Sequence, residues 1–274
     1  MPFATLCGSL SQHPSPLGAS MHDAGYKALG LPFSYIPFAV RDLPGALSGM
    51  RALGIRGFGV SYPFKQQVMP LLDAIDPLAR RIGAVNTIVN DDGKLTGHNT
   101  DWVGAVRALE EVRPLASARV LLLGAGGAAR AIAYGVTERG ARVTVANRDL
   151  AKAQDLANSV GGEARGFDEA ERARDYDVLV NATSLGSTEV DLRSPAPAAA
   201  LRVGLLVMDI VYKPVETMLL AGAHTAGATT VHGGRMLLHQ AAKQFELYTG
   251  QSAPLEAMDA ALRAKIEGER TPKL

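Results

Sequence analysis

Short apolar runs alternate with amphipathic segments along most of the chain. Runs typical of buried strands lie near Thr5–Leu10, Ser34–Phe38, Gly57–Ser61, Asn86–Asn90, Val120–Leu123, Arg142–Ala146, Asp177–Asn181 and Leu205–Asp209, with a last short strand ending at Val231. Segments with helical spacing lie near Ala19–Leu29, Pro44–Leu53, Phe64–Ile75, Trp102–Glu110, Met236–Thr249 and Pro254–Lys265. Strands that alternate with helices predict an α/β protein with parallel sheets and helices on both faces. One turn, Asp91-Asp-Gly93, is typical of a hairpin.

The strand Val120–Leu123 runs directly into a glycine turn and a helix. Gly124 permits the tight turn, Gly126 lets a pyrophosphate approach the backbone, and Ala129 is small enough for the helix to lie close to the strand. The N-terminus of that helix offers N–H groups and a partial positive charge to an anion. The sequence therefore predicts a dinucleotide-binding turn, with cofactor contacts at Gly124, Ala125, Gly126, Gly127 and Ala128.

The next predicted strand ends at Asn147, Arg148 and Asp149, about 20 residues past the glycines, where a Rossmann unit contacts the adenosine ribose. An acidic residue alone at this point would indicate NAD. Arg148, with Asn147 before it and Lys152 one turn on, instead favours a 2′-phosphate, because a guanidinium pairs its N–H groups with phosphate oxygens. Asp149 opposes this by like-charge repulsion, or it merely caps the following helix. We predict NADP as the cofactor, with NAD as the alternative.

Composition narrows the class of protein further. The 274 residues suffice for two modest domains, and a formal net charge of +1 gives no electrostatic footprint for nucleic acid or an anionic membrane. The single cysteine, Cys7, excludes a disulfide framework and a thiolate metal cluster, and it is expected as a small buried residue of the first strand. With no metal and no apolar run long enough to span a bilayer, we expect a cytoplasmic protein, monomeric or homodimeric, that acts on a small molecule.

Lys65 and Asp101 are the candidates for acid–base chemistry. Pro63 is expected to start a helix that places Lys65 in its first turn, and Asp101 stands at the start of the helix that leads into the nucleotide-binding domain. An amine held by a carboxylate can exchange protons with a substrate. Taken alone, the two residues are more typical of ordinary solvated or salt-bridged charges.

Motifs of polar and glycine residues recur in a fixed order from about residue 6 to residue 250. They are Gly8-Ser-Leu-Ser-Gln-His-Pro-Ser15-Pro16, His22-Asp-Ala-Gly-Tyr-Lys-Ala-Leu-Gly-Leu31, Val60-Ser-Tyr-Pro-Phe-Lys65, Gly83-Ala-Val-Asn-Thr87, Gly97-His-Asn-Thr-Asp101, Gly124-Ala-Gly-Gly-Ala128, Asn147-Arg148, Asn181-Ala-Thr-Ser-Leu-Gly186, Asp209-Ile-Val-Tyr-Lys-Pro214, Glu216-Thr217 and Gln240-Ala-Ala-Lys-Gln-Phe-Glu-Leu-Tyr-Thr-Gly250. In order and spacing this set resembles the shikimate dehydrogenase family.

The resemblance implies an N-terminal α/β substrate-binding and catalytic domain, formed by residues 1–102 with 236–274. It also implies a Rossmann-type NADP-binding domain at 103–235, with the active site in the interdomain cleft. Lys65 and Asp101 match the family's catalytic pair. The matching substrate contacts are Ser15, Ser61, Asn86, Tyr212 and Gln240, and the further cofactor contacts are Thr183, Ile210 and Gly233. Short hydroxyl and amide side chains suit a polyhydroxylated ring acid, since they leave few buried polar groups unpaired.

The chain departs from the family pattern at several positions. His13 stands where the first of two serines is usual, Gly18 and Ala19 are extra, Gly59 replaces an asparagine, and Arg235 replaces a glycine beside the expected nicotinamide contact. The carboxylate site is therefore altered, and His13 is either a new donor to an anionic group or a solvated loop residue. The ring acid could accordingly be shikimate, quinate or a relative.

The resemblance implies an enzyme of the shikimate pathway of chorismate and aromatic amino acid biosynthesis. As an NADP-dependent shikimate dehydrogenase, it would reversibly reduce 3-dehydroshikimate to shikimate. One alternative is a quinate/shikimate dehydrogenase that prefers NAD, for which Asp149 and His13 speak. Another is a non-catalytic NADP-binding accessory protein, against which the retained Lys65 and Asp101 count. A reductase that shares only the nucleotide-binding half is disfavoured by the motifs of the first domain.

Overall fold

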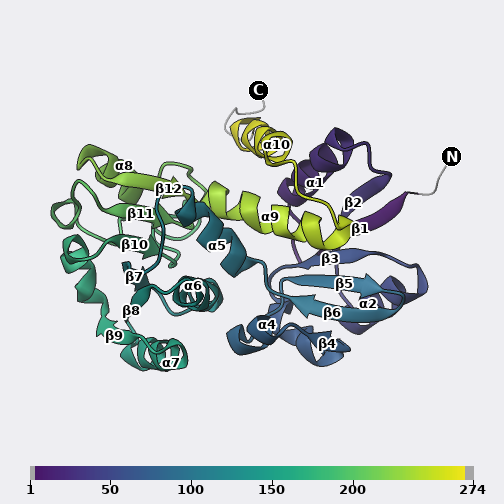
Figure 1. Cartoon of the computed structure of the whole chain (residues 1–274), viewed down its shortest axis with the longest axis horizontal. Helices are drawn as coiled ribbons and strands as arrows, with labels where there is room; N and C mark the ends of the chain where they lie inside the picture. Colours follow the sequence, from purple (N-terminus) through teal and green to yellow (C-terminus); the bar gives the residue numbers. More distant parts are fainter. Residues whose placement is uncertain (1–3, 269–274) are drawn as a thin grey trace. The chain divides into compact units, whose positions relative to one another are not determined.

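The computed structural model describes residues 4–268, and the chain divides into two compact units (Figure 1). Unit 1 comprises Met1–Thr100 with Gln240–Leu274, and unit 2 comprises Asp101–His239. Residues 1–3 and 269–274 of the expected substrate domain lie outside the described part of the chain. Within residues 4–268, no helix combines the length and the apolar character needed to cross a membrane.

Unit 1 is built on a six-stranded sheet with the strand order β2-β1-β3-β5-β6-β4. Its strands are β1 (Thr5–Ser11), β2 (Phe33–Ala39), β3 (Gly57–Val60), β4 (Ala74–Ile75), β5 (Thr87–Asp91) and β6 (Lys94–His98). The helices between them are α1 (Pro16–Ala28), α2 (Leu43–Ala52), α3 (Phe64–Gln67), the 3-10 turn η1 (Met69–Leu71) and α4 (Pro77–Ile82). Each of the four strands predicted in this region is present, within two residues at either end.

Two expectations for unit 1 are wrong in part. The sheet is not wholly parallel, because β5 runs antiparallel to both β3 and β6. The two-residue turn at Asp92 and Gly93 can join β5 to β6 only as an antiparallel hairpin. The helix expected at Phe64–Ile75 ends at Gln67, since Pro70 has no N–H to donate to a preceding turn.

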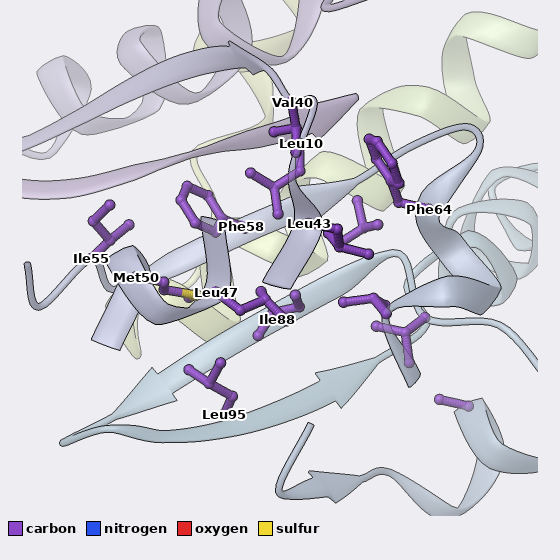
Figure 2. Packing of buried hydrophobic residues seen from close by; sticks show 14 residues of the cluster. Leu10, Val40, Leu43, Leu47, Met50, Ile55, Phe58, Phe64, Ile88 and Leu95 are labelled. Carbon is purple, nitrogen blue, oxygen red and sulfur yellow. The ribbon is translucent and has the colours of Figure 1, made fainter. Parts of the chain in front are cut away.

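One core of unit 1 lies between α2 and the sheet (Figure 2). Leu43, Leu47 and Met50, at helical spacing on α2, meet Phe58 of β3 and Ile88 of β5. Asp42 begins the helix by accepting a hydrogen bond from the Gly45 N–H, and Pro44 stands in the first turn, where a missing N–H costs nothing.

The C-terminal helices complete unit 1. The helix α9 (Gly233–Thr249) enters the unit at Gln240, and α10 (Leu255–Gly268) packs against α1. An aromatic cluster lies where α1 meets α9, and the buried His22 ring stacks on Tyr35 with centroids 4.3 Å apart. Burial lowers the pKa of His22 to about 4.

Unit 2 contains a second six-stranded sheet, with the order β12-β11-β10-β7-β8-β9 and every pair parallel. The strands are β7 (Arg119–Leu123), β8 (Arg142–Asn147), β9 (Glu163–Gly166), β10 (Val178–Asn181), β11 (Leu206–Asp209) and β12 (Thr229–His232). The helices are α5 (Asp101–Glu110), α6 (Gly127–Glu138), α7 (Leu150–Val160), α8 (Met218–Thr225) and the 3-10 segments η2 (Phe167–Asp175) and η3 (Ala198–Ala200). This arrangement confirms the predicted Rossmann-type domain.

The sequence patterns missed the shorter and the less amphipathic elements. The strands β4 and β9 have two and four residues, none of them fully buried. The helix α8 carries apolar residues on several sides, from the exposed Met218 to the buried Leu219 and Leu220, so no helical period stands out. Helix α9 begins at Gly233, three residues before the predicted Met236.

Candidate functional site

The glycine turn of unit 2 has the geometry of an anion-binding loop. Gly124 adopts φ +108°, and a Cβ there would lie 2.9 Å from the Ala182 carbonyl oxygen, so a side chain is excluded. Gly126 and Gly127 face space without protein atoms within 4 Å of an added Cβ. Gly126 caps α6 without a side-chain hydrogen bond, which leaves the first-turn N–H groups to an outside acceptor. These residues fit the pyrophosphate of a dinucleotide.

The residues predicted to contact the ribose lie at the end of β8 or directly after it, and they differ in the partners that their side chains have. Asp149 is the N-cap of α7, and its carboxylate accepts hydrogen bonds from the Ala151 N–H (3.1 Å) and the Lys152 N–H (3.3 Å). The Lys152 ammonium also lies 3.6 Å from that carboxylate. Arg148 is exposed at the strand end, while Asn147 donates to the Asp149 carbonyl. Asp149 is thus occupied by its helix, and Arg148 is the residue with a side chain suited to a 2′-phosphate.

Four further predicted contacts of unit 2 lie just beyond the strand ends of the same sheet. Thr183 follows β10, while Ile210 and Tyr212 follow β11. Gly233 begins α9 directly against this loop, because a Cβ on Gly233 would lie 2.3 Å from the Ile210 carbonyl oxygen. Ligands of parallel sheets bind at the carboxyl ends of the strands, which is where all of these residues are found.

Asp101 and Arg235 also belong to unit 2. Asp101 is the first residue of α5 and is 4% exposed. The Arg235 guanidinium forms a two-pronged ion pair with Glu111, whose carboxylate also lies 2.8 Å from the buried His239 ring. Burial alone raises the pKa of Glu111, but the hydrogen bonds from Arg235 and His239 hold it below its usual value. The arginine that departs from the family pattern is therefore neutralised by a carboxylate of its own unit.

In unit 1, the backbone brings Ser61, Lys65 and Asn86 to one edge of the sheet. The Ser61 N–H donates to the Leu10 carbonyl at the end of β1, and the Val60 N–H donates to the Asn86 carbonyl. The Val85 N–H, one residue before Asn86, donates to the Lys65 carbonyl (2.8 Å). Lys65 is half-buried in α3, and Ser61 is exposed. A hydroxyl, an amine and an amide therefore share this edge.

Asn86 is a buried hub of hydrogen bonds. Its Oδ1 accepts from the Thr100 N–H (2.6 Å) and from the Thr87 hydroxyl (2.9 Å), and its Nδ2 donates to the Thr100 hydroxyl (3.0 Å). The side chain of Gln244 on α9 donates to the Thr87 hydroxyl (3.0 Å). Thr87, Thr100 and Gln244 lie within the ordered motifs but were not predicted as site residues, although Gln244 is one helical turn from the predicted Gln240. Gln240 is half-buried.

The first motif, at residues 8–16, leads into the start of α1. The Ser15 hydroxyl accepts a hydrogen bond from the Leu17 N–H (3.3 Å) and caps α1, so this serine has a structural role whether or not it binds a ligand. His13 is exposed. Gly59 lies where a Cβ would be 2.9 Å from the Tyr35 hydroxyl, which therefore takes up the space that a larger side chain at this position would need.

Family models match both units. Residues 10–88 match the shikimate dehydrogenase substrate-binding domain, residues 107–215 the shikimate/quinate 5-dehydrogenase, and residues 233–263 the shikimate 5′-dehydrogenase C-terminal domain. The chain belongs to the shikimate dehydrogenase family. The resemblance drawn from the ordered motifs is thereby confirmed, together with the two-part α/β fold that it implied.

Several relatives and solved structures resemble the chain over nearly its whole length. The shikimate dehydrogenase (NADP(+)) of Natronomonas pharaonis is 47% identical over 250 residues, which are 90% of this chain and 93% of the relative. A crystal structure of a shikimate dehydrogenase in complex with NADP+ has a TM-score of 0.90 at 36% identity and covers 96% of both chains. The 5-ketofructose reductase of a Gluconobacter strain has a TM-score of 0.90 at 35% identity and covers 96% of this chain and 99% of its own.

Proposed function

We propose that the protein is an NADP-dependent shikimate dehydrogenase that reversibly reduces 3-dehydroshikimate to shikimate. The observation that carries this proposal is the sheet edge of unit 1, where Ser61, Lys65 and Asn86 are held side by side through the backbone. A polyhydroxylated ring presents hydroxyl groups that such short polar side chains can pair. The family relationship supports the same reaction class.

The cofactor is proposed to bind at the strand ends of unit 2. The uncapped first turn of α6 holds the pyrophosphate, and Arg148 pairs with the 2′-phosphate. When bound, NADPH supplies the hydride that reduces the carbonyl carbon. Thr183, Ile210 and Gly233 are assigned to the nicotinamide end on the strength of their place beyond β10 and β11.

Lys65 and Asp101 are assigned the proton chemistry. In the reductive direction, the Lys65 ammonium donates a proton to the carbonyl oxygen, so that a hydroxyl forms instead of an alkoxide. In the oxidative direction, neutral Lys65, or Asp101 together with it, accepts the hydroxyl proton. Ser15, Ser61, Asn86, Tyr212 and Gln240 orient the ring acid, and orientation itself lowers the barrier.

Two observations support a second candidate. Asp149 is adjacent to Arg148 and is negatively charged, which weakens binding of a 2′-phosphate, and His13 stands in the motif expected to hold the carboxylate. Both features favour a quinate/shikimate dehydrogenase that prefers NAD. We infer in either case that the enzyme works in the cytoplasm, since its single cysteine, Cys7, is a buried free thiol, as is typical of a reducing compartment.

An initial-rate panel tests these assignments. Shikimate and quinate are each oxidised with NADP+ and NAD+, and dehydroshikimate is reduced with NADPH and NADH. We expect kcat/KM for shikimate with NADP+ to exceed the other three oxidative combinations at least tenfold. A preference for quinate with NAD+ would establish the second candidate. Tight NADPH binding without turnover of any of these ring acids would instead indicate a non-catalytic binding protein.

A further inference from the structure

A buried carboxylate lies among the loops assigned to the nicotinamide end. Asn181 and Asp209 are the last residues of β10 and β11 and stand opposite each other in the parallel register. Both side chains are fully buried, although both are polar. A buried carboxylate without a structural or functional reason is rare, because burial disfavours its charge. The reason must therefore be sought in what Asp209 holds.

Three donors from three different segments converge on Asp209. Its Oδ1 accepts hydrogen bonds from the Asn181 Nδ2 (2.9 Å) and from the Val211 N–H (3.0 Å). Its Oδ2 accepts from the Thr217 hydroxyl (2.7 Å), and Thr217 is also the N-cap of α8. One side chain thus fixes the end of β10, the loop after β11 and the start of α8.

Asn181 extends this network into the loop after β10. Its Oδ1 accepts from the Thr183 N–H (3.1 Å) and from the Thr183 hydroxyl (2.7 Å), and its Nδ2 also donates to the Leu185 carbonyl (3.0 Å). The Thr183 hydroxyl in turn accepts from the Leu185 N–H (3.1 Å). Three separate sequence motifs, those of Asn181, Asp209 and Thr217, therefore form one continuous hydrogen-bonded unit.

We propose that Asp209 is a positioning residue of the reaction, which holds the loops bearing Thr183, Ile210 and Tyr212 in the arrangement that hydride transfer requires. The inference rests on the proposed function for its kinetic consequence. The close contact of Gly233 with the Ile210 carbonyl means that a shift of this loop must also disturb the first turn of α9. Neither Asp209 nor Asn181 needs to touch a ligand for this role.

The chemistry of the three donors explains why a carboxylate stands here. An ionised carboxylate offers only acceptors, and all three partners of Asp209 donate to it. An asparagine could accept from Asn181 and Val211 through one oxygen, but its N–H group would then face Thr217, whose hydroxyl would have to change from donor to acceptor. Burial raises the pKa of Asp209 to about 6, even though the hydrogen bonds from Thr217, Val211 and Asn181 oppose the rise. Burial of the ionised Asp209 therefore lowers the free energy of unfolding, as is common where function requires a fixed geometry.

Asp209→Asn tests the proposal by kinetics and by hydrogen exchange. The pyrophosphate turn and Arg148 are untouched, so the Kd of NADPH, measured by fluorescence, should change less than threefold. We expect kcat to fall at least tenfold, and the kinetic isotope effect with C4-deuterated NADPH to rise as hydride transfer becomes rate-limiting. The amides of Thr183, Leu185 and Val211 should exchange at least fivefold faster than in the wild type.

The controls separate positioning from stability alone. Thr144→Val removes another buried hydroxyl from the same sheet, one that bonds to Tyr176, and should lower Tm without changing kcat. Thr217→Ser keeps both the donor to Asp209 and the helix cap and should behave as the wild type, whereas Thr217→Val should lower kcat. Unchanged amide exchange in Asp209→Asn overturns the inference even if the wild type proves inactive on ring acids. So does a kcat within twofold of an active wild type.

Discussion

Asn86 in unit 1 and Asp209 in unit 2 occupy comparable places with different chemistry. Asn86 lies one residue before β5 and Asp209 is the last residue of β11; each side chain is buried, and each joins several segments by hydrogen bonds. The Asn86 amide accepts a hydrogen bond from the Thr87 hydroxyl and donates one to the Thr100 hydroxyl. Asp209 only accepts, so its partners are all donors. A neutral hub is insensitive to pH, whereas a charged hub couples the geometry of its loops to protonation.

The largest expected effect comes from removing the amine of unit 1. Lys65→Met should lower kcat about 10²- to 10⁴-fold, the range typical of a lost general acid. The Kd of NADPH should stay within twofold, because the cofactor contacts are assigned to unit 2. Steady-state rates and fluorescence titration measure the two quantities. Lys94→Met, at an exposed lysine of β6, is the matched control and should be silent. Near wild-type turnover by Lys65→Met would remove Lys65 from the mechanism.

The two units should also respond to pH with opposite signs. The folded pKa of Asp209, about 6, exceeds the unfolded value of about 3.9, so its stabilisation is complete below pH 4 and is lost as pH rises through 6, by about 3 kcal/mol at most. The folded pKa of His22, about 4, lies below the unfolded value of about 6.5, so its stabilisation is present above pH 6.5 and is lost as pH falls through 4.

Urea unfolding at pH 4, 5, 6 and 7 measures this contrast. The difference in unfolding free energy between the wild type and Asp209→Asn should fall with rising pH. The difference between the wild type and His22→Gln should rise over the same interval. If both differences in unfolding free energy stayed constant from pH 4 to pH 7, neither Asp209 nor His22 would have the pKa shift that its burial predicts.

A smaller effect is expected at the ribose end of the cofactor site. Arg148→Ala should lower kcat/KM for NADPH about 10-fold or more, since a charged hydrogen bond contributes about 1.5–3 kcal/mol. The value for NADH should not change, because NADH has no 2′-phosphate. Arg142→Ala, at the exposed start of the same strand, serves as the control. An equal loss with both cofactors would show that Arg148 acts on something other than the phosphate.

The smallest effect tests the neutral hub. Thr87→Val removes the hydroxyl that donates to Asn86 and accepts from Gln244, so Asn86 becomes less firmly held. We expect the KM for shikimate to rise about threefold to tenfold and the unfolding free energy to fall by about 1 kcal/mol, the usual worth of a hydrogen bond. Thr96→Val in β6 is the comparison variant. A KM that does not respond would uncouple Asn86 from the substrate.

Local chemistry made much of the fold predictable. The run Val120–Leu123 and the glycines after it combine an apolar strand with a turn that only glycine permits, and both features are short-range. Strand ends in unit 1 were placed within two residues for the same reason. Pro70 is a local signal that a helix ends before it, but the helical spacing of apolar residues in Phe64–Ile75 led to the prediction of one longer helix.

The hubs were not predictable in the same way. Asp209 meets Asn181 only because β10 and β11 pair in one particular register, and Thr217 reaches Asp209 only once α8 has formed. Gln244 likewise meets Thr87 across more than 150 positions of sequence. Such contacts depend on tertiary pairing, which periodicity does not encode. The cap role of Asp149, by contrast, was one of the alternatives that its place before a helix predicted, and the structure confirms it.

Unit 1 is formed by two separate stretches of the chain, and this affects how the protein folds during translation. Arg56 donates to the backbone carbonyls of Leu247 and Tyr248, and Phe245 fills the space beside Gly25. All of unit 2 is translated between these partners. A nascent chain can therefore complete unit 2 while unit 1 still lacks the helices that cover its aromatic cluster. If translation stopped before Gln240, the released product would contain all of unit 2 but only the first stretch of unit 1. We expect proteases to degrade such a product, because its apolar surface is exposed.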